Sequence, residues 1–265
     1  MKLYLDPGHG GSDPGAHGNG MNEKDITLDI ALNIQTILTN YENVQVKMSR
    51  TTDQTVSLTE RTNQANSWGA DYFLSIHCNS FNGSAQGYED YIHSSLSDSS
   101  QTAKYQDTLH KAIVDLNQLN DRGQKKANFH VLRESSMPAL LTENGFIDNE
   151  HDGALLKKPA WRKQVAQGHV NGLVKAFNLK RKQEGAAIIY RIIAGSFKSR
   201  ENANDRADFL QTNGIESFVG AITISGEQWY RVQAGAFSDQ ENAEKRLNEV
   251  IKAGVKDAFI VKEKR

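Results

Sequence analysis

The chain has 265 residues, of which 38% are apolar, and it carries 31 Lys and Arg residues against 32 Asp and Glu residues. This length and composition predict a globular protein with room for one large and one small domain, and they exclude a disordered chain. The formal net charge of −1 gives no support to nucleic-acid binding, and no apolar run reaches the roughly 18 residues needed to span a bilayer.

Strand-like and helix-like segments alternate along the first part of the chain. The expected strands are Lys2 to Asp6, Val44 to Met48, Tyr72 to His77, Tyr88 to Ile92, His130 to Arg133 and Pro138 to Thr142. One helix is expected to begin after Asn22. Three further helices are expected at Leu58 to Trp68, Thr102 to Leu119 and Trp161 to Phe177. Alternation of this kind predicts an α/β fold, a sheet covered by helices.

The helix after Asn22 has the clearest pattern, because its apolar residues recur on one face from Ile26 to Tyr41. Asn22 is a suitable N-cap residue, and Asp25 follows three positions later. With this cap, Glu23 occupies the first position of the helix.

The pattern stops near Lys180, and the segment 180–187 is expected to be a linker between domain 1–179 and domain 188–265. Lys and Arg number 16 against 20 acidic residues up to Leu179, and 15 against 12 from Lys180 onward. This surplus of three positive charges in the tail is compatible with an anionic polymer, but a solvated surface explains it equally well.

The tail contains an internal repeat. Residues 190–197 (YRIIAGSF) recur forty positions later as residues 230–237 (YRVQAGAF), and the similarity continues through Glu201-Asn202-Ala203 and Glu241-Asn242-Ala243. Each copy is expected to form a strand, a helix and a second strand. Neither copy is large enough to bury its apolar face alone, so we expect both to share one sheet in a small α+β domain.

Four residues with metal or acid-base chemistry stand at the edges of the expected elements. His9 lies in a glycine-rich loop after the first strand, Glu23 begins a helix, His77 ends a strand and Glu143 follows Thr142 at the end of another. Zinc prefers imidazole nitrogens and carboxylate oxygens, and a catalytic zinc keeps one position open for water. The set therefore indicates a Zn²⁺ hydrolase with His9, Glu23 and His77 as ligands. Glu143 would be the general base that activates the water and then protonates the leaving amine of an amide.

Each of these residues also has a purely structural interpretation. His9 could satisfy backbone groups of its turn, His77 could be an ordinary residue at a strand end, Glu23 could complement the helix dipole, and Glu143 could cap a turn. Cys78 is expected to face the core, because strand neighbours point to opposite faces. As the only cysteine it cannot form an intramolecular disulfide. We expect His17 to be a solvated loop residue and the other histidines to be structural or exposed. Asn79 could line the site and orient the substrate, or it could belong to a turn, and we do not count it among the catalytic residues.

Several motifs resemble those of the zinc-dependent N-acetylmuramoyl-L-alanine amidases. They are DPGHGGSDPGA from Asp6, Asn22-Glu23-Lys24, Ser49-Arg50-Thr51, SIHCN from Ser75 and PALLTENGF from Pro138. The resemblance covers residues 1–179 and implies a mixed, twisted six-stranded sheet with flanking helices. It also implies that His9, Glu23 and His77 bind zinc, that Glu143 is catalytic, and that the substrate is the amide between muramic acid and the L-alanine of the peptidoglycan stem peptide.

The repeat region is similar to the SPOR domain, which implies a peptidoglycan-binding module of four strands and two helices. The tail aromatics Tyr190, Phe197, Trp229, Tyr230 and Phe237 could stack on sugars or bases, but strand packing predicts that most belong to the core. The whole arrangement most resembles mother-cell-lysis amidases of Bacillus and related phage endolysins. Peptidoglycan is thus the expected partner, with no nucleic acid and no membrane, while the oligomeric state stays open.

The N-terminus enters a strand at once, without the regions of a secretory signal peptide. We therefore expect synthesis in the cytoplasm and action on the cell wall after lysis, through a holin, or by non-classical release. Two other functions stay open from the sequence: a zinc enzyme that cuts a different peptidoglycan bond, as a peptidase or a deacetylase, and a non-enzymatic wall-binding or amidase-activating protein.

Overall fold

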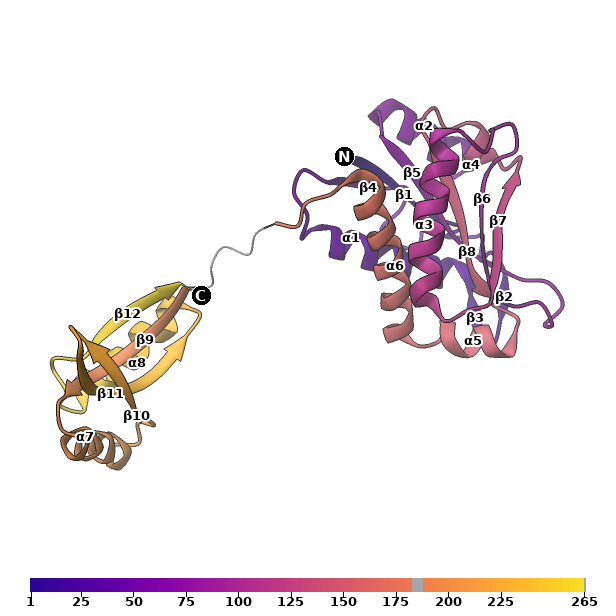
Figure 1. Ribbon diagram of the computed structural model, residues 1–265. Helices are drawn as coiled ribbons and strands as arrows, with labels where there is room; N and C mark the ends of the chain where they lie inside the picture. The colour runs from indigo at the N-terminus through magenta and orange to yellow at the C-terminus, as the bar shows by residue number, and fades with distance from the viewer. Residues whose placement is uncertain (183–187, 265) are drawn as a thin grey trace. The chain divides into compact units, whose positions relative to one another are not determined.

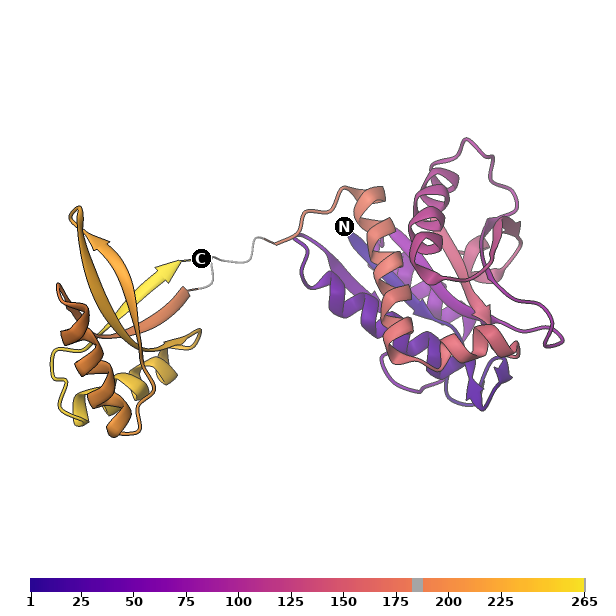
Figure 2. The ribbon, with the colours of Figure 1, turned by 60° about the horizontal axis from the view of Figure 1, so that its bottom comes forward.

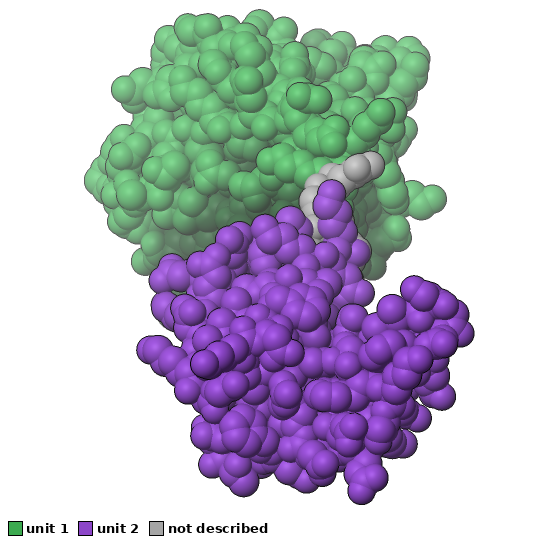
Figure 3. All heavy atoms as spheres, turned by 90° about the vertical axis from the view of Figure 1, so that its left-hand side faces the viewer, with its two compact units in different colours: residues 1–182 green, residues 183–265 purple. Residues whose placement is uncertain are grey.

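The structure is a computed structural model that describes residues 1–182 and 188–264. The chain forms two compact units, Met1–Lys182 and Gln183–Arg265, which Figure 3 shows in different colours. Most of the expected linker lies outside the described residues. Its first three residues are part of the first unit, where the Glu42 amide donates to the Lys180 carbonyl over 2.8 Å and the Lys182 amide donates to the Asn40 carbonyl over 2.7 Å.

A six-stranded mixed sheet is the centre of the first unit (Figure 1), as predicted. Its order is β4-β1-β5-β8-β6-β7; β1, β4, β5 and β8 run parallel, β6 is antiparallel to β8, and β7 is parallel to β6. The strands are β1 (Lys2–Pro7), β4 (Gln45–Met48), β5 (Tyr72–Asn79), β6 (Tyr88–His93), β7 (Asp121–Ala127) and β8 (Ala139–Phe146). A small hairpin joins β2 (His17–Gly18) to β3 (Met21–Asn22).

Helices cover both faces of this sheet (Figures 1 and 2). They are α1 (Glu23–Leu38), α2 (Leu58–Trp68), α3 (Gln101–Asn117), α4 (His130–Arg133), α5 (Glu150–Leu156) and α6 (Pro159–Phe177). Leu3 and Leu5 of β1 belong to the core formed with α1, α3 and α6, whereas Tyr4 between them packs with residues of α2 and α4. This period of two assigns every strand residue to one of two faces, which we call the α1 face and the α2 face.

The same alternation places the expected site residues. Cys78 belongs to the core of the α1 face, as predicted. His77 therefore projects to the α2 face, and Glu143 lies beside it because the two residues are partners in the parallel β5–β8 register. The carboxyl ends of β1, β5 and β8 meet at one edge of the sheet, and this edge carries the site.

Two local predictions differ from the structure. Residues His130–Arg133 form the helix α4 rather than a strand, because Val131 and Leu132 are consecutive and both buried in one core. A helical turn can bury two such neighbours together, whereas a strand would direct them to opposite faces. The strand β7 was not predicted: its sequence DRGQKKA is polar, and it is an edge strand with exposed positions.

The second unit is a four-stranded antiparallel sheet in the order β10-β11-β9-β12. Its elements are β9 (Ile188–Phe197), α7 (Arg200–Thr212), β10 (Phe218–Ile224), β11 (Glu227–Phe237), α8 (Gln240–Lys252) and β12 (Phe259–Lys264). The two repeats contribute equivalent residues to one core, with Ile192, Ala194 and Leu210 from the first and Val232, Ala234 and Val250 from the second. The predicted sharing of one sheet is therefore confirmed.

Among the described residues, no helix is both long and apolar enough to cross a membrane.

Candidate metal centre

The loop Gly8-His9-Gly10 leaves the end of β1 and is fixed on both sides. The Gly8 amide donates to the Ile76 carbonyl of β5 over 2.9 Å. His9 has a positive φ of 61°, a conformation that is unusual for a residue with a side chain. A Cβ atom on Gly8 would lie 2.3 Å from Cε1 of His77, so glycine is required where the loop passes the second imidazole.

Two buried arginines hold the carbonyl groups of this loop. Arg50 donates to the Pro7 carbonyl (3.1 Å) and the Gly8 carbonyl (2.8 Å), and Arg61 donates to the Pro7 and His9 carbonyls, each over 2.8 Å. Arg61 also forms an ion pair of 2.6 Å with Asp6, and only 4% of the Arg61 and 1% of the Asp6 side chain is exposed. The guanidinium groups thus compensate the cost of a backbone turn whose carbonyls face inward.

The structure brings three of the four predicted residues together. His9, Glu23 and His77 each offer a ligand atom within 4.8 Å of the others. His9 Nε2 lies 3.1 Å from Glu23 Oε2, and His77 Nδ1 lies 2.9 Å from Glu23 Oε1. Two imidazoles and one carboxylate are the donors that zinc prefers, and a set of three leaves a position for water, so these residues fit a catalytic metal ion.

Glu23 is buried and its carboxylate is fully engaged. Oε2 accepts from the Ala16 amide (2.8 Å) and Oε1 from the Cys78 amide (2.9 Å), in addition to the two imidazoles. Burial alone would raise the pKa of Glu23, but the hydrogen bonds with His77 and His9 outweigh it and hold the pKa well below its usual range. Glu23 therefore carries a negative charge at the place where a cation would sit.

The helix start that presents Glu23 is capped by backbone rather than by the predicted side chain. Asn22 occupies the N-cap position, but its side chain accepts no capping hydrogen bond. The Glu23 amide instead donates to the Ala16 carbonyl (2.8 Å) and the Lys24 amide to the Pro14 carbonyl (3.1 Å). The loop after His9 is thus attached directly to the first turn of α1.

Asp13 orients the first imidazole, a role that the sequence interpretation missed. Its Oδ2 lies 2.8 Å from His9 Nδ1, which leaves Nε2 directed at Glu23. A carboxylate on the second nitrogen of a ligating histidine is the usual outer partner at metal sites. The available signal was an aspartate four residues after the histidine in a glycine-rich loop.

Glu143 lies on the neighbouring strand with an unused acceptor. Its Oε2 atom is buried and has no hydrogen-bond partner among the described residues. Burial raises the pKa of Glu143 well above its usual range, and the carboxylates of Glu23 and Glu89 raise it further. A carboxyl group with a high proton affinity and a free oxygen is suited to taking up and releasing a proton.

The remaining histidines are outside this centre. His17 is exposed in the β2–β3 hairpin, and His169 is buried on α6, where it contacts Thr142 over 3.1 Å. His110 lies between Asp90 (2.8 Å) and Asp121 (3.0 Å) on the α1 side of the sheet. Asn79 donates to Glu89 over 2.9 Å, one strand away from Glu143.

A cavity of about 350 Å³ opens beside His9 and His77. His9, Asp13 and His77 line it, together with Val56 and with Leu58, the first residue of α2. Leu58 is 54% exposed, so the cavity presents an apolar wall next to the charged centre.

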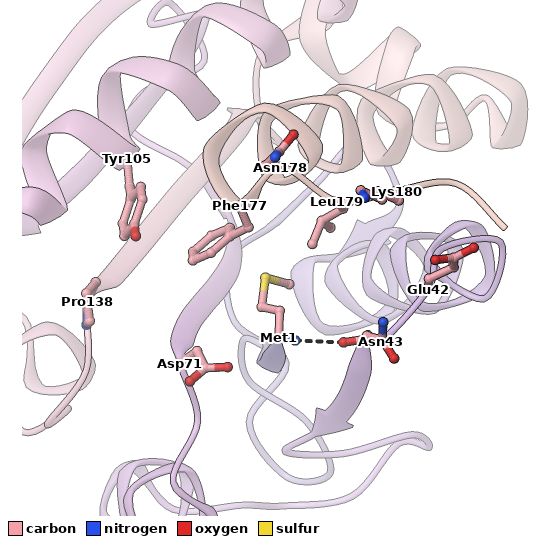
Figure 4. A pocket seen from close by; sticks show the side chains of 10 residues that line it. All are labelled: Met1, Glu42, Asn43, Asp71, Tyr105, Pro138, Phe177, Asn178, Leu179 and Lys180. Carbon is pink, nitrogen blue, oxygen red and sulfur yellow. Dashed lines mark hydrogen bonds between the residues drawn. The ribbon is translucent and has the colours of Figure 1, made fainter.

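A larger cavity of about 690 Å³ lies elsewhere (Figure 4), at the edge where β1, β5 and β8 begin. Met1, Tyr105 and Phe177 line it, and the Met1 amino group donates to the Asn43 carbonyl over 2.7 Å. It is at the opposite edge of the sheet from His9, Glu23 and His77.

Comparison with known proteins shows the family of the chain. The family model of N-acetylmuramoyl-L-alanine amidases matches residues 3–175. The chain belongs to this amidase family. The SPOR domain model matches residues 186–262, so the amidase domain is followed by a SPOR domain.

Relatives of this chain include proteins of Bacillus and of one Bacillus phage. The chain is 51% identical over 220 residues to a sporulation-specific N-acetylmuramoyl-L-alanine amidase of Bacillus subtilis (strain 168), covering 83% of this chain and 84% of that protein. It is 45% identical over 188 residues to an endolysin of Bacillus phage SPP1, covering 70% and 69% of the two proteins. The solved catalytic domain of the amidase CwlV from Bacillus (Paenibacillus) polymyxa var. colistinus superposes with a TM-score of 0.64 at 32% identity, covering 68% of this chain and 99% of that domain.

Proposed function

We propose that this amidase is zinc-dependent and hydrolyses the amide bond between N-acetylmuramic acid and the L-alanine of the peptidoglycan stem peptide. His9, Glu23 and His77 are the proposed metal ligands, and Glu143 is the proposed catalytic residue. The observation that carries the proposal is the position of the Glu143 carboxyl group, which has a raised pKa and one buried oxygen without a hydrogen-bond partner in the described part of the chain. It lies on the strand next to a cluster of two imidazoles and one carboxylate.

The side chains of the site have separate roles in the proposed reaction. Bound by the three ligands, a zinc ion supplies Lewis acidity, which makes water more acidic and polarises the amide carbonyl. Glu143 accepts a proton from the attacking water and passes it to the nitrogen of the departing L-alanine. Asp13 keeps His9 Nε2 directed at the metal position, and the arginine-held loop keeps the imidazole from rotating away.

The test is digestion of purified Bacillus peptidoglycan by the full chain, with and without a chelator, followed by mass spectrometry. We expect stem peptides that begin with L-alanine, and only when chelator is absent. Cleaved cross-links or deacetylated glycan would indicate a peptidase or a deacetylase, and an absence of products would support a non-enzymatic wall protein.

A substitution separates metal binding from catalysis. Glu143→Gln keeps the size of the side chain but removes the exchangeable carboxyl proton, so we expect bound zinc to stay near one ion per chain while peptide release falls at least about a hundredfold. The matched control is Glu134→Gln, an exposed glutamate that pairs with Arg133 on the surface. A fully active Glu143→Gln enzyme would contradict the mechanism.

The SPOR domain is proposed to hold the enzyme on the cell wall through the sheet face opposite the core formed with α7 and α8. Phe218, Gln233, Ile193 and Phe259 form one row across the four strands, since each is paired with the next. Directly paired residues project to the same face. Phe218 and Phe259 are 56% and 48% exposed at the two edges of this row, which suits packing against the apolar faces of sugar rings.

Cosedimentation with purified cell wall tests this attachment. We expect the double variant Phe218→Ser/Phe259→Ser to lose wall retention while its rate on a soluble muramoyl peptide is unchanged. Phe209→Ser is the control, because Phe209 is 42% exposed but lies on α7. Equal retention of the wild type, the double variant and Phe209→Ser on the cell wall would refute the assignment of this face.

A further inference from the structure

A charged cluster lies next to Glu143 on the α2 face and has no role in the mechanism above. Glu89 of β6 is directly opposite Glu143 in the antiparallel β6–β8 pair, so their Cβ atoms are separated by about 5 Å. Glu89 itself is buried, with 3% of its side chain exposed. The cluster is therefore part of the same surface as the proposed catalytic residue.

Four donors surround the Glu89 carboxylate. Asn79 (2.9 Å) and Tyr91 (2.7 Å) donate to Oε1, and Arg122 Nε (2.6 Å) and Lys125 Nζ donate to Oε2. Burial opposes ionisation, but the hydrogen bonds with Lys125, Tyr91 and Arg122 hold the pKa of Glu89 below its usual range. Glu89 is thus ionised, and its carboxylate holds the side chains of Arg122 and Lys125 in place beside Glu143.

One buried carboxylate needs one counter-charge, yet two cations are present. Among the described residues, Glu89 is the only carboxylate that forms an ion pair with Arg122 or Lys125. The side chains of Arg122 and Lys125 are 35% and 34% exposed, so both retain donors that solvent or a ligand can reach. Arg122 is held further by the ring of Phe146, 4.9 Å from its Cζ atom. Glu89, Arg122 and Lys125 together have a net charge of +1. Two ordered and accessible cations with this surplus charge are suited to binding an anion.

The order of the strands determines which part of the substrate this anion belongs to. His9 and His77 lie near the ends of β1 and β5, Glu143 lies near the end of β8, and the cations are on β7, beyond β6. Glu143 protonates the departing amine in the proposed mechanism, so the peptide leaves on its side of the metal. Neighbouring strands are about 4.8 Å apart and an extended peptide advances about 3.4 Å per residue. The charged ends of Arg122 and Lys125 lie at Glu89 on β6, one strand spacing from Glu143 on β8. A group on the second residue beyond the cleaved bond, about 7 Å along an extended peptide, therefore reaches them.

We propose that Arg122 and Lys125 form a subsite for a free carboxylate on the second residue of the stem peptide. This inference rests on the proposed amidase reaction and specifies its substrate. A peptide whose second residue carries a carboxylate gains a charge-assisted contact, whereas the same peptide with that carboxylate amidated does not. The subsite therefore makes the enzyme selective for the unamidated peptide.

The experiment compares two soluble substrates that differ only in this group, N-acetylmuramoyl-L-alanyl-D-isoglutamate and its isoglutamine counterpart. For the zinc-loaded full chain we expect kcat/KM to be about tenfold higher for the carboxylate substrate. In Arg122→Gln and in Lys125→Gln, the ratio of the two kcat/KM values should fall close to one, mainly because kcat/KM for the carboxylate substrate is lower. Arg122→Lys should retain part of the preference.

Lys126→Gln is the matched control. Lys126 is on the same strand but projects to the opposite face, where it pairs with Asp98 over 2.6 Å. Lys126→Gln changes the net charge of the protein by the same amount as Arg122→Gln or Lys125→Gln, but it should leave the ratio of the two kcat/KM values unchanged.

The ratio of kcat/KM for the isoglutamate substrate to kcat/KM for the isoglutamine substrate distinguishes a carboxylate subsite from a purely structural role of Arg122 and Lys125. If Arg122 and Lys125 only stabilised the buried Glu89, their variants would lower kcat/KM for both substrates equally, and the inference would be wrong. Equal rates for the two substrates in the wild-type enzyme would overturn it as well and leave the proposed function intact. If neither these substrates nor whole peptidoglycan released peptides, the proposed function itself would fail.

Discussion

Arg61→Met is expected to destabilise the amidase domain strongly, because Arg61 is the buried partner of a buried carboxylate. The guanidinium group forms a 2.6 Å ion pair with Asp6 and donates to the carbonyls of Pro7 (2.8 Å), His9 (2.8 Å) and Val56 (3.0 Å). Methionine fills a similar volume but leaves the charge of Asp6 without a cation. Removing one partner of a buried pair costs about 3 to 5 kcal/mol of unfolding free energy. For a unit of this size, this corresponds to a fall in Tm of roughly 6 to 20 °C.

Urea unfolding of the metal-free full chain, followed by tryptophan fluorescence, measures this cost. Asp6→Asn should relieve it, so Asp6→Asn/Arg61→Met is expected to be more stable than the sum of the single variants predicts, by at least about 1 kcal/mol. Arg133→Met is the surface control, because Arg133 is 41% exposed and pairs with Glu134; it should cost less than about 0.5 kcal/mol. A loss below about 1 kcal/mol for Arg61→Met, or strictly additive variants, would refute the reasoning.

Two further predictions concern the loop and the pH dependence. In Gly8→Ala the new Cβ would lie 2.3 Å from Cε1 of His77, so the imidazole must turn away from Glu23; zinc titration should show affinity at least about tenfold weaker. Gly220→Ala, where the nearest atom is 3.9 Å away, is the control, and equal zinc affinity in both variants would contradict the prediction. Burial lowers the pKa of His169 from 6.5 to about 4, so the unfolded chain binds the proton more readily between these values and stability falls as the pH drops through this window. The stability advantage of the wild type over His169→Gln should therefore shrink by about 2 kcal/mol between pH 7 and pH 5 in urea titrations, and a constant difference would argue against a neutral buried histidine.

The sequence was sufficient to predict those parts of the molecule that depend on local pattern. Strand alternation places His77 and Glu143 on one face and Cys78 in the core, and the carboxyl ends of neighbouring parallel strands meet by necessity. The arginines that hold the His9 loop could not be predicted in this way. Their position depends on carbonyls more than forty residues away in the sequence, as in the contact of Arg61 with His9.

The direction of one strand explains why the cation cluster beside Glu143 was also missed. Polar residues at the ends of strands mark the site for the parallel strands β1, β5 and β8. Because β6 runs antiparallel to β8, residues near its beginning face Glu143, and Glu89 is the second residue of that strand. The cations then come from β7, whose polar sequence contains no strand signal and which is parallel to β6. In a mixed sheet, charged residues near the start of a strand therefore lie beside those at the end of its neighbour wherever strand direction reverses.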